Sequence, residues 1–258
     1  MLLIVVAVTF LLAWSAESLV RYIPFSVEVS LAGKYAAQAD HDDATTAYLQ
    51  KLAARLAAAQ NLPQDMKITV HYVDEDTINA FATLGGHIVV FRGLLEKIPD
   101  ENTLAMVISH EIAHIQHRHP IMSLGRGLVV GLALAALSGL SDIDIAGDVL
   151  GEAGLLTVLK FSREQELEAD RTALAALAKV YGHIGGANEL FKMFQDVAVS
   201  SRQPPQLLSS HPHTERRIEA INTLAAEYGW QSDGTLTPLP KPVEQRLQRH
   251  AKASGSND

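Results

Sequence analysis

The chain contains no cysteine. Structural disulfides, thiolate zinc sites and thiol catalysis are therefore excluded, and any bound metal must use histidine and carboxylate ligands. Basic residues are in deficit as well, because the formal net charge is −8 and no basic stripe is present, which argues against a general nucleic-acid binder. Hydrophobic residues make up 48% and charged residues 19% of the 258 residues, so the chain is neither disordered nor a polytopic membrane protein.

Apolar runs of full membrane-spanning length are also lacking, since a free-standing helix needs about 20 residues. The nearest approach is Met1–Ala16, where Trp14 near the end suits a membrane interface. We expect a single-pass membrane anchor here; a cleavable export signal, whose usual preceding basic residue is missing, and a buried helix are the alternatives. A second run, residues 127–140, predicts a buried helix or hairpin, or else a membrane-facing or substrate-channelling surface.

The periodicity of the remaining chain predicts an α+β fold that is mainly helical. Helices are predicted at residues 42–60, 104–119, 163–179 and 215–228, and strands at 67–73 and 87–91. We expect the strands to form a small antiparallel sheet. The resulting organisation is an anchor at residues 1–20, a catalytic domain at 21–230 and a flexible C-terminal tail at 231–258, where proline, glycine, serine and scattered charge prevail.

The most informative stretch, His110-Glu111-Ile112-Ala113-His114, reads H-E-x-x-H within a predicted helix. Positions four apart lie one above the other on a single helix face, so the two imidazoles can bind one Zn²⁺. Glu111 beside them can hold the water that the metal activates and take its proton as general base. Asp100 and Asn102 are the candidate N-caps of this helix, and Pro120 should end it.

A catalytic zinc usually has three protein ligands and a water, so a third ligand is needed. Ser162, with Gln165 three residues later, is a capping-box pattern that predicts the start of a helix. On this helix Glu166 and Asp170 are four apart and share a face. We assign Glu166 to the metal, and Asp170 to the ring N–H of one of the two ligand histidines, where it would fix the tautomer.

These motifs resemble a known family. H-E-x-x-H followed by S-R-x-x-E-x-E-A-D is similar to the membrane-linked zinc metallopeptidases that include HtpX, BepA and the CAAX prenyl proteases. The likeness covers residues 23–230 and further includes Asn79-Ala80-Phe81, Gly85-Gly86-His87-Ile88-Val89-Val90, Ser209-Ser210-His211-Pro212 and Arg216-Arg217-Ile218. It implies a gluzincin fold, with a small sheet bordering the active-site cleft, one zinc per subunit, and Glu166 and Asp170 in the roles given above.

In this family the segment that contains His211 and Arg217 approaches the cleft, so both residues are candidates to assist catalysis. Stabilising the developing oxyanion would contribute about 3 kcal/mol. His211 has a rival role: as a fourth zinc ligand it would displace water and keep the enzyme latent.

The strand at residues 87–91 is expected to form an edge strand beside the metal. An extended peptide can add to free N–H and C=O groups there, which would make His87, Ile88, Val89 and Val90 substrate-binding residues. The alternative is an ordinary core strand.

The remaining charged residues near the motifs are expected to be solvated. His117 and His119 are interpreted as polar residues at the end of the motif helix, where a cation suits the helix dipole. Glu164 and Glu168 fall on other faces of their helix than Glu166 does.

Together these observations predict a membrane-anchored zinc endopeptidase for protein quality control, whose domain faces the extracytoplasmic side of a bacterial inner membrane. Its partners would be misfolded or membrane-associated proteins, and no nucleic acid. One alternative is a chaperone-like scaffold that binds unfolded chains around a structural zinc; the intact Glu111 argues against it, because a structural site needs no base. Another is a hydrolase of non-peptide amides.

Overall fold

The computed structural model describes residues 19–20, 22–32, 44–138, 160–190, 192, 211 and 214–254. The predicted anchor therefore lies, but for its last two residues, outside the described residues. Within these ranges, no helix combines the length and apolar character that crossing a bilayer requires.

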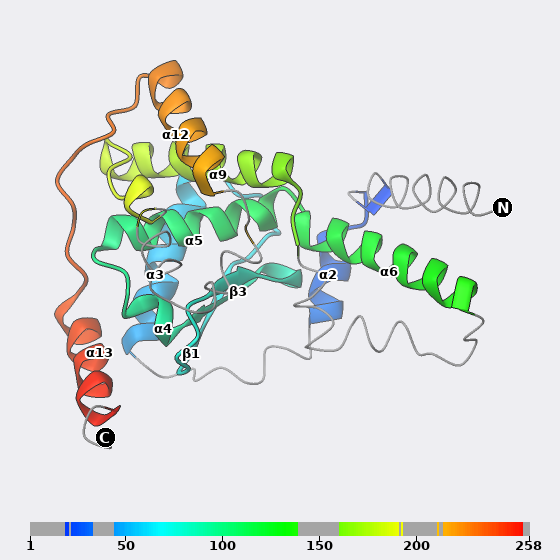
Figure 1. Cartoon of the computed structure of the whole chain (residues 1–258), viewed down its shortest axis with the longest axis horizontal. Coiled ribbons are helices and arrows are strands. Elements are labelled where there is room, and N and C mark those ends of the chain that lie inside the picture. The colour runs from blue at the N-terminus through cyan, green and yellow to red at the C-terminus, as the bar shows by residue number, and fades with distance from the viewer. Residues whose placement is uncertain are drawn as a thin grey trace.

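The described residues form a mainly helical structure with one small sheet, which confirms the predicted class (Figure 1). The helices are α2 (Phe25–Ala32), α3 (Ala44–Ala59), α4 (Arg92–Leu95), α5 (Glu101–Gln116), α6 (His119–Ser138), α9 (Arg163–Tyr181), α12 (Thr214–Tyr228) and α13 (Lys241–Ser254), with a short 3-10 turn, η1 (Leu84–Gly86). The strands are β1 (Thr69–Val73), β2 (Ala80–Ala82) and β3 (His87–Phe91). The four predicted helices correspond to α3, α5, α9 and α12.

Helix α5 carries the H-E-x-x-H motif through the middle of the structure, between α9 and the sheet (Figure 1). Asp100 is its N-cap, since the Thr103 N–H donates to the Asp100 carboxylate at 2.8 Å. The helix ends at Gln116, earlier than predicted, because Arg118 adopts a left-handed conformation with φ of 64°. Pro120 lies in the first turn of α6, where its missing N–H costs nothing, so it begins a helix there instead of ending one.

The sheet is mixed, and the expected antiparallel pairing of its two longer strands is wrong. Strand β3 pairs in parallel with β1, with Thr69 opposite His87, and antiparallel with β2, with Ala80 opposite Val90. The strand order β1-β3-β2 makes β3 the central strand. Its buried residues Ile88 and Val90 alternate with more exposed ones, as the period of a strand requires.

The C-terminal segment expected to be a flexible tail contains helix α13, so that part of the prediction is wrong. Leu239, Val243 and Leu247 are buried in the main hydrophobic core. Their spacing of four residues is typical of one face of a helix, which the composition of the segment does not indicate. The segment before the helix is fixed as well, because the Thr237 carbonyl accepts the Glu101 N–H at 2.8 Å.

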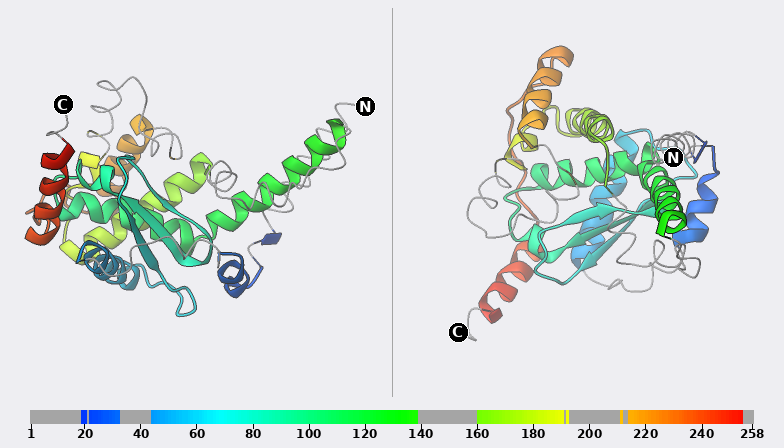
Figure 2. Two further views of the ribbon diagram at one scale, coloured as in Figure 1. Left: turned by 90° about the horizontal axis from the view of Figure 1, so that it is seen from below. Right: turned by 45° about the vertical axis from the view of Figure 1, so that its right-hand side comes forward.

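The second apolar run lies in helix α6 as far as Ser138, and the remainder of the run is outside the described residues. The helix projects away from the body formed by α5, α9 and the sheet (Figures 1 and 2). A helix is thus confirmed for this part of the run, but residues 127–131 are half-buried or exposed and not buried as expected. A membrane-facing role stays a prediction.

A polar cluster around the buried Glu101 joins α3, α5 and α9 at the start of the motif helix. The Glu101 carboxylate accepts hydrogen bonds from the hydroxyls of Tyr48 and Tyr181, both at 2.9 Å, and from Arg55. Burial opposes ionisation of this carboxyl, but the hydrogen bonds from Arg55 and the two tyrosines outweigh it and hold the pKa of Glu101 below its ordinary value.

Replacing Glu101 with glutamine should lower the free energy of unfolding by about 1–3 kcal/mol, since the charge-assisted hydrogen bonds are lost. Because the folded-state pKa of Glu101 is depressed, its contribution is present above the unfolded pKa and disappears as the pH falls through the folded value. Urea unfolding at several pH values should therefore show the difference between wild type and variant shrinking in acid. Glu227→Gln, an exposed control, should leave stability unchanged at every pH.

Candidate metal centre

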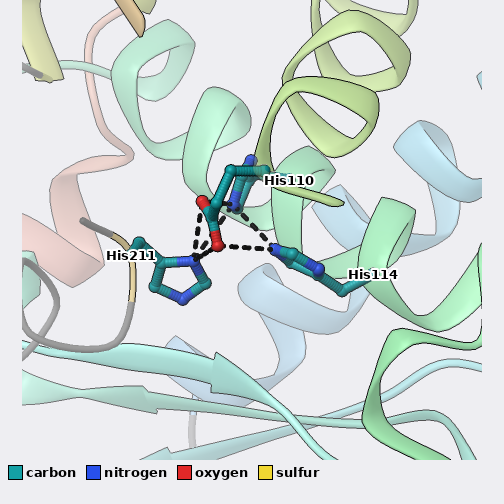
Figure 3. Close-up of side chains that lie close together, drawn as sticks. His110, His114 and His211 are labelled. Atoms are coloured by element: carbon teal, nitrogen blue, oxygen red, sulfur yellow. Dashed lines mark hydrogen bonds and ion pairs between the residues drawn. The ribbon is translucent and has the colours of Figure 1, made fainter. Parts of the chain in front are cut away.

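Four buried side chains from three separate parts of the chain meet at one point (Figure 3). His110 and His114 come from α5, Glu166 from the first turn of α9, and His211 from the segment before α12. One potential ligand atom from each lies within 4.8 Å of all the others. The structure thus brings together the three residues that the sequence assigned to the metal, and adds His211.

The distances within the cluster fit a single small cation. The Nε2 atoms of His110 and His114 are 2.9 Å apart, and the Glu166 carboxylate oxygens lie 3.3 Å and 3.7 Å from them. Ligands about 2 Å from one tetrahedral Zn²⁺ would be about 3.3 Å from each other. Imidazole nitrogens and a carboxylate are also ligands that zinc prefers, so the residues present fit this metal.

Of the two ligand histidines that the sequence left open as the partner of Asp170, the structure puts His110 next to it. The Asp170 carboxylate lies 3.0 Å from Nδ1 of His110. Arg217 donates to both oxygens of the same carboxylate at 2.7 Å and approaches Glu166 at 3.0 Å. Burial opposes ionisation of Asp170, but the Arg217 guanidinium and the His110 hydrogen bond hold the pKa of Asp170 below its ordinary value.

Glu111 lies beside the cluster without belonging to it. Its carboxylate accepts the Ala82 backbone N–H at 2.7 Å, and its other oxygen is 3.6 Å from Nε2 of His211. Burial raises the pKa of Glu111, which makes the carboxylate a stronger base than one in water. A base next to a metal site, and not bound by the metal, is the arrangement that water activation requires.

Comparison with known proteins gives the same result as the geometry. The family model described as peptidase family M48 matches residues 43–225, which is most of the chain and includes α5, α9 and most of α12. This chain belongs to peptidase family M48.

Relatives within the M48 family include the mitochondrial metalloendopeptidase OMA1 of Schizosaccharomyces pombe, which is 31% identical over 182 residues, or 69% of this chain and 52% of the relative. The beta-barrel assembly-enhancing protease of Escherichia coli K12 is 28% identical over 199 residues, or 69% of this chain and 38% of the relative. The chain thus spans about half the length, or less, of these relatives.

The substrate-binding assignment made for this M48 domain at His87, Ile88, Val89 and Val90 fails on strand order. Because β3 has a partner on each side, its backbone groups are not available to an added strand. The outer strands are β1 and β2, and the Ala82 N–H of β2 donates to Glu111. A strand of only three residues gave too short a pattern to be predicted.

The sequence also misplaced one histidine of the M48 site. His119 is 1% exposed, and its Nδ1 is 2.8 Å from Nδ1 of the ligand His114. Phe161, which no motif indicated, stacks on the His114 ring with a centroid distance of 3.9 Å. The interpretation of His119 as a polar helix-end residue is therefore wrong, whereas Glu164 is exposed as predicted.

Asp170→Asn should weaken zinc binding by about 10–100-fold, because the amide cannot match the charged acceptor that orients His110 and pairs with Arg217. Competition with a chromophoric chelator measures the affinity. The exposed Asp65→Asn serves as the matched control and should bind as wild type does. Equal affinities of the two variants would contradict this role for Asp170.

Proposed function

We propose that this chain is a zinc-dependent endopeptidase that hydrolyses peptide bonds without a covalent enzyme intermediate. The observation that carries the proposal is the convergence of His110, His114 and Glu166 in one buried cluster with Glu111 directly beside it. Membership of family M48 and the names of its metalloendopeptidase relatives support it.

Bound zinc would supply Lewis acidity for the scissile carbonyl and would lower the pKa of a water from 15.7 towards ~7. The protein supplies the proton transfers. Glu111 takes the proton of the attacking water at its carboxylate and passes it to the leaving amine. Its position on α5, one residue after the ligand His110, fixes the base relative to the metal.

We propose β2 as the substrate-binding strand in place of β3, with the peptide pairing along its outer edge. The Thr83 N–H donates to His87 and the Asn79 carbonyl accepts from Phe91, so these groups point towards β3. In an antiparallel pair the groups of alternate residues point the other way, which directs those of Ala80 and Ala82 outward. Both residues are buried in this structure, so an extended peptide would pair with them beside Glu111 once the groups that cover them have moved.

Of the two roles considered for His211, we propose the latent one. Its Nδ1 lies 2.9 Å from Glu166 and 3.3 Å from Nε2 of His110, which is where a fourth ligand would be. Its Nε2 faces Glu111. Arg217 is held by Asp170 and Glu166, so its contacts support ligand orientation; a direct contribution to the oxyanion stays a prediction.

Protein quality control at a membrane is the proposed setting. The apolar run at residues 1–16 supports an anchor, and the apolar character of α6 supports contact with lipid. The name of the Escherichia coli relative, a beta-barrel assembly-enhancing protease, favours the bacterial envelope and an extracytoplasmic domain. Misfolded or membrane-associated proteins are the proposed substrates.

Glu111→Gln should abolish most peptidase activity and leave zinc binding intact. The amide has nearly the same shape but cannot take a proton, so a loss on the order of 10²–10⁴-fold in kcat is expected. Casein cleavage and bound-metal analysis of the same preparation measure the two properties.

The same pair of proteins tests the chaperone-like alternative. A scaffold with a structural zinc would prevent aggregation of unfolded casein equally well with and without the Glu111→Gln change, and neither protein would cleave it. Cleavage by wild type alone supports the peptidase, and the exposed Glu227→Gln protein controls for the preparation.

His211→Ala should increase the basal cleavage of an unstructured peptide, since a fourth ligand would be removed. A tenfold rise would correspond to an accessible site in about 10% of the wild-type molecules. Initial rates under saturating zinc provide the measurement. Loss of activity with every substrate tried would instead establish His211 as an assisting residue.

A further inference from the structure

His119 is a buried polar residue that the proposed mechanism does not use. It is the first residue of α6 and lies against the ligand His114, with the two Nδ1 atoms 2.8 Å apart. Its other ring nitrogen, Nε2, is 3.2 Å from a carboxylate oxygen of Glu168 on α9. The three side chains form a line from the metal cluster to the surface, where Glu168 has 53% of its side chain exposed.

The direction of the hydrogen bonds along this line follows from the position of His114 in the cluster. His114 turns Nε2 towards His110 and Glu166, so a metal ion would take that nitrogen. The ring proton of His114 is then on Nδ1 and must be donated. The Nδ1 of His119 is consequently the acceptor, and His119 carries its own proton on Nε2, which it donates to Glu168.

We propose that His119 is a positioning residue of the zinc site, which connects the Glu168 carboxylate to the ligand His114 and fixes the tautomer and ring orientation of that ligand. The inference rests on the proposed zinc site. A ligating histidine needs an acceptor for its second ring nitrogen, and loss of such an acceptor weakens metal binding.

The two ligand histidines would then be supported in different ways. His110 meets the carboxylate of Asp170 directly, whereas His114 meets a neutral imidazole that in turn meets a carboxylate. Among the described residues, His119 is the only recorded hydrogen-bond partner of Nδ1 of His114. Phe161 stacks on the ring face, at 19° between the planes, and restricts its tilt without accepting the proton.

The turn between α5 and α6 holds His119 in place for this task. Arg118, in its left-handed conformation, forms an ion pair with the buried Glu28 of α2 and donates to the Ile23 carbonyl at 2.8 Å. Pro120 on the other side fixes its own φ angle. The backbone on both sides of His119 is therefore held in place independently of a metal ion.

His117 offers a matched comparison, because it belongs to the same turn and also approaches Glu168, at 3.4 Å. Its Nε2 contacts the Thr172 hydroxyl at 2.9 Å, so it does not serve His114. If any histidine near Glu168 could fill the role, replacing either His117 or His119 would weaken zinc binding. If the role is to orient the ligand His114, only the replacement of His119 would weaken it.

The experiment compares His119→Met with His119→Gln by zinc competition against a chromophoric chelator. The two side chains have nearly the same length, but only glutamine offers an oxygen acceptor. We expect His119→Met to bind zinc about 10–100-fold more weakly than wild type, and His119→Gln to retain most of the affinity. His117→Met should bind as wild type does, and thermal unfolding of the metal-free proteins should show that the folds match.

Glu168→Ala removes the exposed end of the line, and its effect should depend on His119. It should weaken zinc binding in the wild-type background and have no further effect in His119→Met. Glu168 is half-exposed, so its replacement by alanine should not unfold the protein, and this variant can be measured even if both His119 variants unfold. Unchanged zinc affinity in Glu168→Ala would overturn the proposal.

Two further outcomes would overturn the proposal. Equal losses in His119→Met and His119→Gln would show that packing matters and the hydrogen bond does not. Wild-type affinity in His119→Met would show that His114 needs no such partner, and the zinc peptidase function would stand unaffected. Failure of the wild-type protein to bind zinc would overturn the proposed function itself, which separates the two conclusions.

Discussion

The packing of α5 against α9 brings a carboxylate into reach of two imidazoles, and the site depends on this contact. Glu166 is 1% exposed and would cost several kcal/mol to bury as an unpaired ion. Burial alone raises the pKa of its carboxyl, but the charge and hydrogen bond of His211 and those of His110 outweigh burial and lower the pKa well below its ordinary value. Charged and hydrogen-bonded partners on both sides therefore fix the two helices relative to each other, and a divalent cation bound here would pair with the same carboxylate.

The supports on the two ligand histidines divide the site into a charged side and a neutral side. On the charged side, Asp170 and Arg217 form a buried ion pair that reaches both His110 and Glu166. On the neutral side, His114 contacts the rings of His119 and Phe161. Burial is the largest influence on His114 and lowers its pKa well below the ordinary value, so this nitrogen ligand is neutral before any metal arrives.

The site could be predicted from the sequence where the information is local. Spacing along one helix placed His110 with His114, and the capping box at Ser162 began α9 at the turn that presents Glu166. The parts that could not be predicted depend on contacts distant in sequence. The central place of β3, the burial of α13 and the meeting of His119 with His114 each follow from how separate elements pack, and the last also needs the left-handed turn at Arg118.

The order of the strands connects the proposed substrate-binding edge of β2 to the general base Glu111. The Ala82 N–H, at the outer edge of β2, donates to the Glu111 carboxylate. A peptide that paired with this edge, as proposed, would need the same N–H and would take the hydrogen bond from Glu111. The carboxylate would then lose a donor that stabilises its charged form. Burial already raises the pKa of Glu111, so such a substrate would make this base stronger beside the metal site.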